Sequence, residues 1–339
     1  MMNCCCCESQ QEAWIREAAE GKPNRFRKDN PRVIDMLESF DCTPPYVDIE
    51  RARYFTESMK QTEGELLVLR WAKALKHIGE NMTVYIDDDQ LIAGRCGQQG
   101  ARYGILYPEL DGDFYEGVLA DFATRENPPI RIDKENIPVL LGEIGSYWKG
   151  KTYHHALFQN MPEFCRHNAY SDAEGLSPRY IVSESSSLRS SLQWVLDFDK
   201  VLKLGFAGVK ADAMRRLEAL DPENPADQLY KRPFLEAVAL VCDAVVVFAH
   251  RHAALAREKA VAEKDPVRKQ ELLEIAERCE WVPEHPARTF HEAVQSHWFA
   301  QAFSRLEQRT GCNCSAVVIG DAKAFHRSSM ELFLQRTAA

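Results

Sequence analysis

Apolar side chains recur at helical spacing in the first third of the chain. Between residues 51 and 81, four of them follow one another at steps of four, three and four residues: Leu67, Trp71, Ala74 and Ile78. Such steps place side chains on one face of an α-helix. The pattern therefore predicts a long helix over 51–81 with one apolar stripe, and Gly64 is a possible break in it.

The second half of the chain also favours helix. Helical patterns extend over 197–220 and over 229–279, and the second of these has a charged break at 264–266. Residues 235–249 form the most apolar stretch, but two acidic residues interrupt it. Because a membrane-spanning helix needs about 18 apolar residues in a row, we expect a buried core helix here.

A last helix is predicted to begin at Thr289. Threonine is a good N-cap, and the carboxylate of Glu292, three residues further on, can accept a hydrogen bond from a free backbone N–H in return. The apolar positions that follow keep helical spacing up to Arg309 and predict the apolar face of this helix: Phe290, Val294, Trp298, Phe299, Phe303 and Leu306.

A small hairpin is predicted between the first helix and the middle of the chain. Two short apolar runs, 84–86 and 91–93, flank the sequence Asp-Asp-Asp-Gln, and Gly94 follows. This arrangement is typical of two strands joined by an acidic turn in solvent. The three aspartates lack the alternate spacing and the closing glutamate of a calcium loop. The Gly, Pro and aromatic residues over 94–133 predict loops that lie over a core.

The composition is that of a folded globular protein with one large domain or two ordinary ones. The chain has 339 residues, of which 45% are hydrophobic and 27% charged. Its formal net charge of -9 offers no positive surface to a nucleic-acid backbone. Neither a membrane span nor a secretory leader is predicted, so we expect a cytoplasmic protein that binds neither nucleic acid nor a membrane.

The cysteines and histidines do not predict a metal site. Four consecutive cysteines at positions 4–7 would point alternately to opposite sides of an extended chain, which disfavours one tetrahedral site. We expect residues 1–30 to form a flexible leader, with a metal-binding module as the alternative. His291 and His297 are six residues apart and fall on different helix faces, unlike the ligand pair of a zinc protease.

Five sequence blocks resemble one known family. They are residues 51–65 (RARYFTESMKQTEGE), 70–75 (RWAKAL), 84–94 (VYIDDDQLIAG), 199–205 (DKVLKLG) and 287–299 (ARTFHEAVQSHWF). In this order they are similar to segments of the glycyl radical enzymes of the pyruvate formate-lyase type. The resemblance covers about residues 35 to 310, so we expect 31–310 to be an N-terminal part of such a domain.

The resemblance implies a fold and a chemistry. The expected fold class is α/β and helix-rich: the first half of a ten-stranded barrel, incomplete in this chain. In the family, a radical on a glycine passes to a cysteine, and the thiyl radical abstracts hydrogen from the substrate. A radical-SAM iron–sulfur activating enzyme installs the glycyl radical. The resemblance therefore implies this partner and a homo-oligomeric parent enzyme, with no cofactor bound directly to the chain.

One segment points to the substrate class. Residues 185–194 (SSSLRSSLQW) resemble the branch of the family that cleaves the carbon–sulfur bond of isethionate, 2-hydroxyethanesulfonate. On that resemblance Arg189 and Gln193 bind the sulfonate of a small anionic substrate. The planar donor fork of Arg189 suits the sulfonate oxygens, and Gln193 lies one helical turn further on. The alternative is a solvated arginine among serines. Residues 193–199 (QWVLDFD) also lack the Gly-His-x-x-Pro-Asp pattern of the dehydratases.

The chain departs from the family at the radical chemistry itself. The family motifs Gly-Cys-x-Glu, with the thiyl cysteine, and Arg-Val-x-Gly, with the radical glycine, are both missing from the sequence. Residues 311–314 (GCNC) imitate the first letters of the former but lack the glutamate. We therefore expect no catalytic residue in this chain. The tail 311–339 has two acids and three bases, unlike the acidic remainder, and a reading-frame shift would explain it.

Three hypotheses about function follow. In the first, the chain is the N-terminal fragment of an enzyme that cleaves isethionate to sulfite and acetaldehyde, and it is inactive alone. In the second, it is a non-catalytic remnant or a structural partner of a separately encoded half that bears the radical. In the third, it is a fragment of another glycyl radical enzyme, such as a dehydratase.

Overall fold

The computed structural model describes residues 32–36, 46–97, 103–112, 115–116, 119, 131–163 and 196–307. The predicted leader 1–30 with its cysteine run lies outside these residues, and so does the tail 311–339. Within the described part, helices dominate and four short strands form two separate two-stranded sheets. The predicted helix-rich character is confirmed. The ten-stranded barrel stays an expectation.

The predicted helix over 51–81 is in fact two helices. Helix α3 (Glu50–Gln61) ends before a turn, and α4 (Leu67–Asn81) packs back against it. Gly64 lies in the turn with φ 92°, a left-handed conformation that glycine adopts without steric cost. The break predicted at this residue is confirmed. The stripe is correct at Ala74 and Ile78, which are buried, but Leu67 is exposed.

The hairpin forms, with a different second arm. Strand β2 (Val84–Tyr85) pairs antiparallel with β3 (Arg95–Cys96), and Val84 lies opposite Cys96. The prediction of 91–93 as the partner run was wrong. The backbone of Ala93 is already paired: its N–H donates to the side-chain oxygen of Gln295, and its carbonyl accepts from the Gln295 amide. This tertiary contact accounts for a strand that begins four residues later than predicted.

The loops expected over 94–133 contain regular structure. Besides β3, this range holds β4 (Tyr103–Ile105) and the short helix α5 (Pro108–Asp111). Strand β4 pairs in parallel with β1 (Tyr46–Asp48), which lies almost 60 residues earlier in the sequence. Such short strands are stabilised by a distant partner rather than by their own sequence pattern, which is why the local composition did not reveal them.

A layer of short helices covers α3. It consists of α7 (Asn136–Pro138), the π-helical turns η2 (Val139–Gly145), α8 (Ser146–Trp148) and α9 (Tyr153–Asn160). The buried indole of Trp148 donates a 2.9 Å hydrogen bond to the hydroxyl of Thr56 on α3. Its ring also stacks on that of Phe55, so this layer is anchored to the same core.

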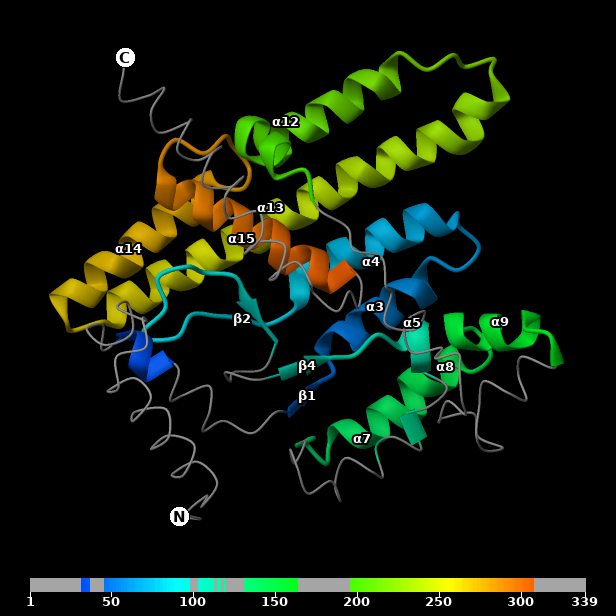
Figure 1. Ribbon diagram of the computed structural model, residues 1–339, viewed down its shortest axis with the longest axis horizontal. Helices are drawn as coiled ribbons and strands as arrows, with labels where there is room; N and C mark the ends of the chain where they lie inside the picture. The colour runs from blue at the N-terminus through cyan, green and yellow to red at the C-terminus, as the bar shows by residue number, and fades with distance from the viewer. Residues whose placement is uncertain are drawn as a thin grey trace, which may run out of the picture.

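The long helices form the body of the molecule (Figure 1). They are α12 (Phe198–Glu218), α13 (Arg232–Ala262) with the π-helical turn η3 (Asp227–Lys231) before it, α14 (Pro266–Trp281) and α15 (Phe290–Glu307). The charged break predicted near residue 264 is confirmed. There Asp265 caps α14 by accepting from the N–H of Val267, and Pro266 occupies the first turn.

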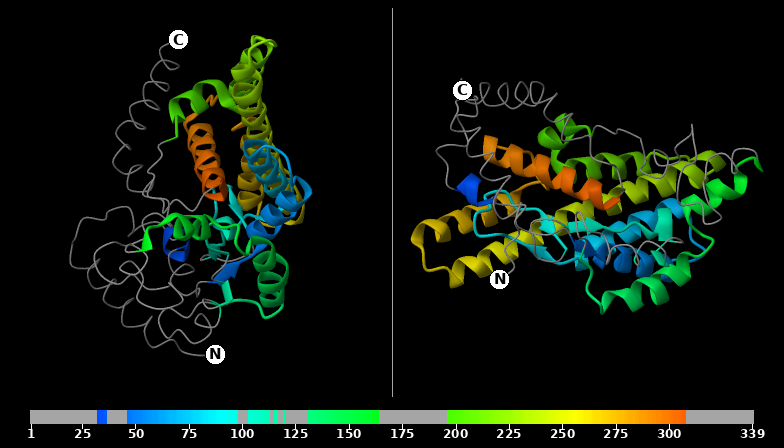
Figure 2. Two further views of the ribbon diagram at one scale, coloured as in Figure 1. Left: turned by 90° about the vertical axis from the view of Figure 1, so that its right-hand side faces the viewer. Right: turned by 60° about the horizontal axis from the view of Figure 1, so that its bottom comes forward.

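Helix α13 is the central element. It packs against α4, α12 and α14, and the views in Figure 2 agree on this arrangement. Among the described residues, the one helix that is long and apolar enough to span a membrane is 227–262, which includes α13. Because α13 packs against three helices, and the most apolar window of 227–262 is 44% buried, the core-helix prediction is confirmed.

Candidate functional site

The two residues predicted to bind a sulfonate, Arg189 and Gln193, lie outside the described residues. The structure does describe the element that follows them, because α12 begins at Phe198. It also describes α15, the last element before residues 308–339. The described residues therefore show which contacts hold these two helices in place.

The start of α12 rests on the middle of α15. Asp197 caps α12, and its carboxylate accepts a 3.1 Å hydrogen bond from the N–H of Lys200. The next residue, Phe198, packs its ring against the imidazole of His297, with 3.9 Å between the ring centroids. Burial lowers the pKa of His297, so this imidazole is neutral at pH 7. The contact is apolar packing rather than an ion pair.

A kink at Gly205 ties α12 to the loop before α15. Gly205 has φ 65°, and the backbone N–H groups after it leave the helical pattern. Phe206 donates to the carbonyl of Pro283 at 2.9 Å, and Ala207 donates to that of Glu284 at 3.0 Å. A Cβ atom on Gly205 would lie 2.1 Å from the Glu284 carbonyl oxygen. Only glycine therefore fits where the two backbones meet.

The cap predicted for α15 is present, with one partner changed. The hydroxyl of Thr289 accepts from the N–H of Glu292 at 3.2 Å, as predicted. The carboxylate of Glu292 accepts from the backbone N–H of Arg288, one residue before the cap, and from the Arg288 guanidinium, both at 2.6 Å. Burial alone raises the pKa of Glu292, but the bonds from Arg288 outweigh it and the pKa is lowered.

The buried face of α15 is more polar than predicted. Phe290 and Trp298, two of the predicted apolar positions, are exposed, whereas Gln295 and Ser296 are fully buried. The element packed against this face explains the polar side chains. One face of α15 lies against the loop at Ala93, whose backbone polar groups need partners that an apolar side chain cannot supply.

Arg51 holds the C-terminal end of α15. Its Nε donates a 2.7 Å hydrogen bond to the carbonyl of Leu306, and an Nη atom donates to that of Glu307 at 3.2 Å. The carboxylate of Glu109 pairs with the same guanidinium through two bonds, of 2.6 and 3.0 Å. The guanidinium also lies over the ring of Tyr107, 4.1 Å from its centroid. This fully buried cation fixes where the chain leaves α15.

Sequence reasoning missed the role of Arg51. The residue lies in one of the family blocks, but its partners lie 58 residues away at Glu109 and 255 residues away at Leu306. No local spacing relates them. The available signal was an arginine at the start of a helix, and such a residue is usually a solvated charge.

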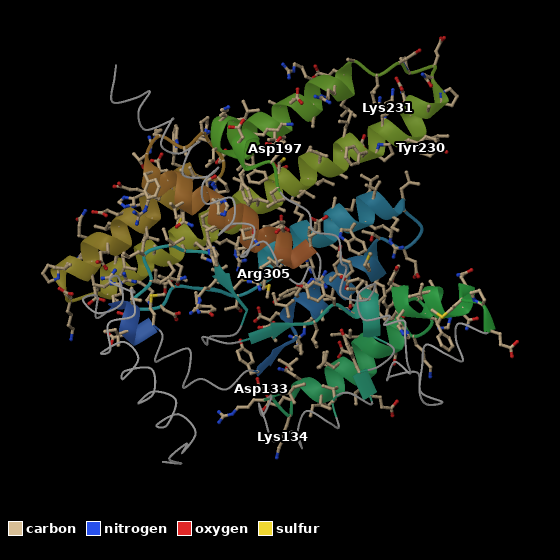
Figure 3. The ribbon with its side chains drawn as sticks, in the orientation of Figure 1. Asp133, Lys134, Asp197, Tyr230, Lys231 and Arg305 are labelled. Atoms are coloured by element: carbon tan, nitrogen blue, oxygen red, sulfur yellow. The ribbon has the colours of Figure 1, made fainter. Side chains whose placement is uncertain are left out.

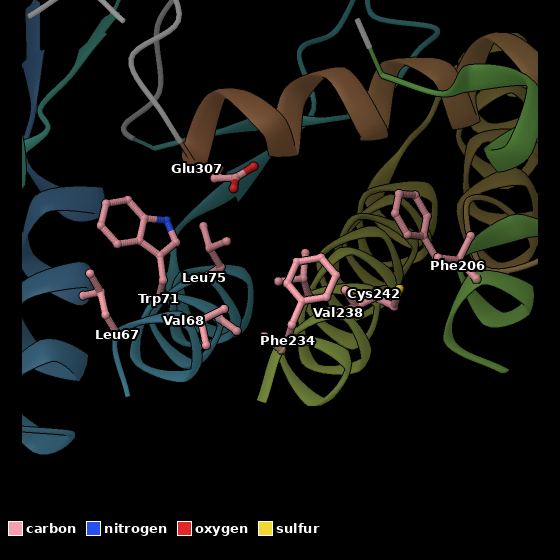
Figure 4. A pocket seen from close by; sticks show the side chains of 13 residues that line it. Leu67, Val68, Trp71, Leu75, Phe206, Phe234, Val238, Cys242 and Glu307 are labelled. Carbon is pink, nitrogen blue, oxygen red and sulfur yellow. The ribbon is translucent and has the colours of Figure 1, made fainter. Parts of the chain in front are cut away.

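An apolar groove lies beneath the end of α15 (Figure 4). It has a volume of about 790 Å³, and its walls come from α4, α12, α13 and the last residue of α15. The lining residues are Leu67, Val68, Trp71, Ala72, Leu75, Phe206, Val209, Phe234, Ala237, Val238, Val241, Cys242 and Glu307. Glu307 is the one ionisable acid among them. Burial raises the pKa of Glu307, although the nearby Arg51 opposes this effect.

Two observations describe the metal-binding and thiol chemistry of the described residues. Among them, no group of three or more His, Cys, Asp or Glu side chains could hold a metal ion. Burial raises the pKa of the Cys242 thiol to about 11 and also raises that of Cys279. Both are therefore protonated and unreactive at pH 7. This part of the chain is a rigid frame with an apolar groove.

Known proteins of one family are similar to most of this chain. Residues 26–316 match the family described as pyruvate formate lyase-like. The isethionate sulfite-lyase of Nitratidesulfovibrio vulgaris is 56% identical over 310 residues, which cover 91% of this chain and 37% of that protein. The trans-4-hydroxy-L-proline dehydratase of Clostridioides difficile is 35% identical over 273 residues, or 79% of this chain and 33% of that protein.

A solved structure is also similar to this chain over most of its length. The glycerol-bound B12-independent glycerol dehydratase from Clostridium butyricum superposes with a TM-score of 0.76 at 30% identity, covering 85% of this chain and 36% of that one. The chain thus spans little more than a third of the length of the relatives that it matches.

Proposed function

The chain belongs to the pyruvate formate lyase-like family and corresponds to an N-terminal part of a glycyl radical enzyme, and on this premise we propose that the parent enzyme cleaves isethionate to sulfite and acetaldehyde. One observation carries the proposal. Identity to an isethionate sulfite-lyase is 56% over 91% of the chain, against 35% to a dehydratase over a shorter part.

The proposal divides the work between this chain and the rest of the enzyme. This chain supplies the frame of α12 and α15, together with Arg189 and Gln193 to hold the sulfonate. The thiyl cysteine and the radical glycine belong to the remaining polypeptide, so the chain alone turns nothing over. A radical-SAM activating enzyme generates the radical. The parent enzyme is a homo-oligomer in the cytoplasm.

A dehydratase is the second candidate. It is supported by the structural likeness to the glycerol dehydratase and by the identity to the hydroxyproline dehydratase. Two facts disfavour it: the identity is lower, and residues 193–199 lack the Gly-His-x-x-Pro-Asp pattern expected of the dehydratases. A non-catalytic remnant, or a partner of a separate radical-bearing half, would account for the length but has no specific observation in its favour.

A chimera tests the activity. Residues 32–307 of this chain would replace the matching part of the Nitratidesulfovibrio vulgaris isethionate sulfite-lyase, and the product would be activated without oxygen by its activating enzyme. We expect sulfite and acetaldehyde in equal amounts from isethionate and no dehydration of glycerol. A chimera that carries the glycyl radical but dehydrates a diol, or leaves isethionate intact, would overturn the proposal.

The same chimera tests the sulfonate site. Arg189→Lys keeps the charge but removes the planar fork, so we expect kcat/KM for isethionate to fall by far more than tenfold. Arg215→Lys, at an exposed position of α12, is the control and should leave turnover unchanged. If Arg189→Lys stays within about tenfold, or about 1.4 kcal/mol, the two-bond role of Arg189 is untenable.

A further inference from the structure

The groove between α4 and α13 has an apolar lining and an open mouth. Figure 4 shows Leu67, Val68 and Trp71 on one wall, Phe234 and Val238 on the other, and Glu307 above them. An apolar trough of about 790 Å³ is large enough to receive several side chains of a polypeptide.

Exposed apolar residues extend the groove outward. Leu67 is 62% exposed and Phe234 is 58% exposed, and both also line the groove. Tyr230, in the η3 turn just before α13, is 75% exposed and lies at one end of the molecule (Figure 3). Leu66 and Leu229 are exposed as well. We call these five residues the apolar shoulder. Exposed apolar side chains gathered beside an apolar groove are typical of an interaction site.

The course of the chain indicates what covers this surface. Helix α15 ends at Glu307, and Glu307 itself lines the groove. Any polypeptide that continues from α15 therefore starts at the groove. Relatives such as the Nitratidesulfovibrio vulgaris enzyme do continue, since the matched part makes up 37% of that protein. A covalently linked segment has a much higher local concentration than a second copy of the chain.

We propose that the groove and the apolar shoulder are the seat of an apolar segment of the polypeptide that follows α15 in the full-length glycyl radical enzyme. This inference rests on the proposed function only in taking the chain as the N-terminal part of such an enzyme. Arg51 has a positioning role in it, because this residue fixes the end of α15 at the rim of the groove.

Glu307 adds a requirement for the occupant. Its carboxyl lies among apolar side chains, and filling the groove removes it further from water. A buried carboxylate is costly unless it is paired. The segment that fills the groove should therefore bring a Lys or Arg side chain, or another hydrogen-bond donor, to Glu307.

Hydrogen–deuterium exchange on two proteins tests the proposal. One is the 339-residue chain, and the other is the chimera of residues 32–307 with the remainder of the relative. We expect the amides of 66–72 and 229–238 to be protected at least about tenfold more strongly in the chimera. The far end of α13, residues 256–262, should exchange equally in both proteins.

Matched variants then link the protection to the groove. Phe234→Asp should abolish the added protection in the chimera while leaving the circular dichroism and melting of the 339-residue chain unchanged. Val261→Asp is the control, since Val261 is 83% exposed on the same helix at its other end, and it should keep the added protection. Because the chain without the remainder is the folding control, a loss specific to the chimera cannot come from a misfolded α13.

Three outcomes would overturn the inference. The first is equal exchange in the two proteins, and the second is added protection that survives Phe234→Asp. The third is protection of 66–72 and 229–238 in the 339-residue chain that rises with its concentration, which would make a second copy the occupant. Turnover is not needed for any of these readings. A chimera that is protected but inactive on isethionate would refute the proposed activity alone.

Discussion

Two parts of α13 differ in what surrounds them, although both are apolar. From its middle toward the C-terminus, the covered end, α13 buries Phe248, Ala253 and Ala256 in the core that it shares with α4, α14 and α15. At its N-terminus, the open end, Phe234 is exposed beside the groove, and Tyr230 of the preceding η3 is exposed as well. The helix α4 repeats the contrast, with Ile78 buried and Leu67 exposed. Apolar sequence alone therefore does not place a helix end in the core, because burial needs a neighbouring element.

Two buried side chains at the covered end bond to backbone carbonyls of the hairpin region. His252 lies between two backbone carbonyls, those of Phe248 and Arg95, each 2.8 Å from a ring nitrogen. Arg268 of α14 donates to the carbonyls of Gln90 and Asp87 in the hairpin turn. These contacts fix the covered end in one arrangement, whereas the open end has mainly apolar surface to offer.

The largest expected effect comes from truncating one phenylalanine in the covered part of α13 and one in its open part. Phe248 is fully buried and its ring meets those of Phe299 and Phe303, so Phe248→Ala should cost about 3–5 kcal/mol of unfolding free energy. Phe234→Ala should cost less than about 1 kcal/mol, because much of that ring is already in water. Urea unfolding of the 339-residue chain measures both. Similar losses would refute the contrast between the two ends.

Replacing one arginine of a buried ion pair and one of an exposed ion pair compares the contributions of the two pairs to stability. Arg51→Met leaves the Glu109 carboxylate buried without its partner, so we expect a loss of about 3–5 kcal/mol. Arg257→Met breaks the ion pair with Glu280, in which both side chains are about half exposed, and should cost less than about 1 kcal/mol. The same urea titration checks both variants. A small loss for Arg51→Met would show that the end of α15 is held by other contacts.

Acid should weaken the covered end through His252. Burial lowers the pKa of His252 from 6.5 to about 4, although the two carbonyls oppose the change. The unfolded chain therefore binds a proton between about pH 6.5 and pH 4 that the folded chain does not. The buried neutral state of His252 therefore contributes about 3 kcal/mol to the free energy of unfolding above pH 6.5. This contribution is lost as the pH falls from 6.5 to 4.

Nuclear magnetic resonance of the imidazole carbon signals would follow this titration directly. A midpoint near 6.5 in the folded protein would contradict the expectation.

A smaller effect is expected at the kink of α12. Gly205→Ala imposes a side chain at φ 65° and a clash with the Glu284 carbonyl, so it should cost at least about 2 kcal/mol. Gly142→Ala is the control, because a Cβ there meets nothing within 4 Å, and it should be neutral or slightly stabilising. Thermal melting distinguishes the two. Equal melting temperatures would mean that the backbone contact between α12 and the loop before α15 is dispensable.

Much of the helical framework could be predicted from the sequence. Helical periodicity and caps are local, so the break near residue 264, the cap at Thr289 and the turn at Gly64 are all confirmed in the structure. The family blocks led to the same family as the comparison with known proteins. The predicted sulfonate residues Arg189 and Gln193 lie outside the described part and stay predictions.

The errors share a physical cause. The hairpin arm at 91–93 and the buried Gln295 both depend on one contact between α15 and the backbone of Ala93. Residues 200 positions apart make that contact, and hydrophobic periodicity carries no information about such pairs. The same holds for Arg51, whose two main partners lie 58 and 255 residues away in the sequence.

The sequence by itself determined the helix-rich character of the second half, the break near residue 264, the cap at Thr289 and the family of the chain, because these depend on local dihedral preferences, caps and ordered blocks. Only the tertiary structure decided which apolar face is covered and which stays open, because burial depends on partners distant in the sequence. It placed Arg51 under the end of α15 and Glu307 at the rim of the groove. Side-chain packing in three dimensions, rather than composition, thus separates the core from the proposed docking surface.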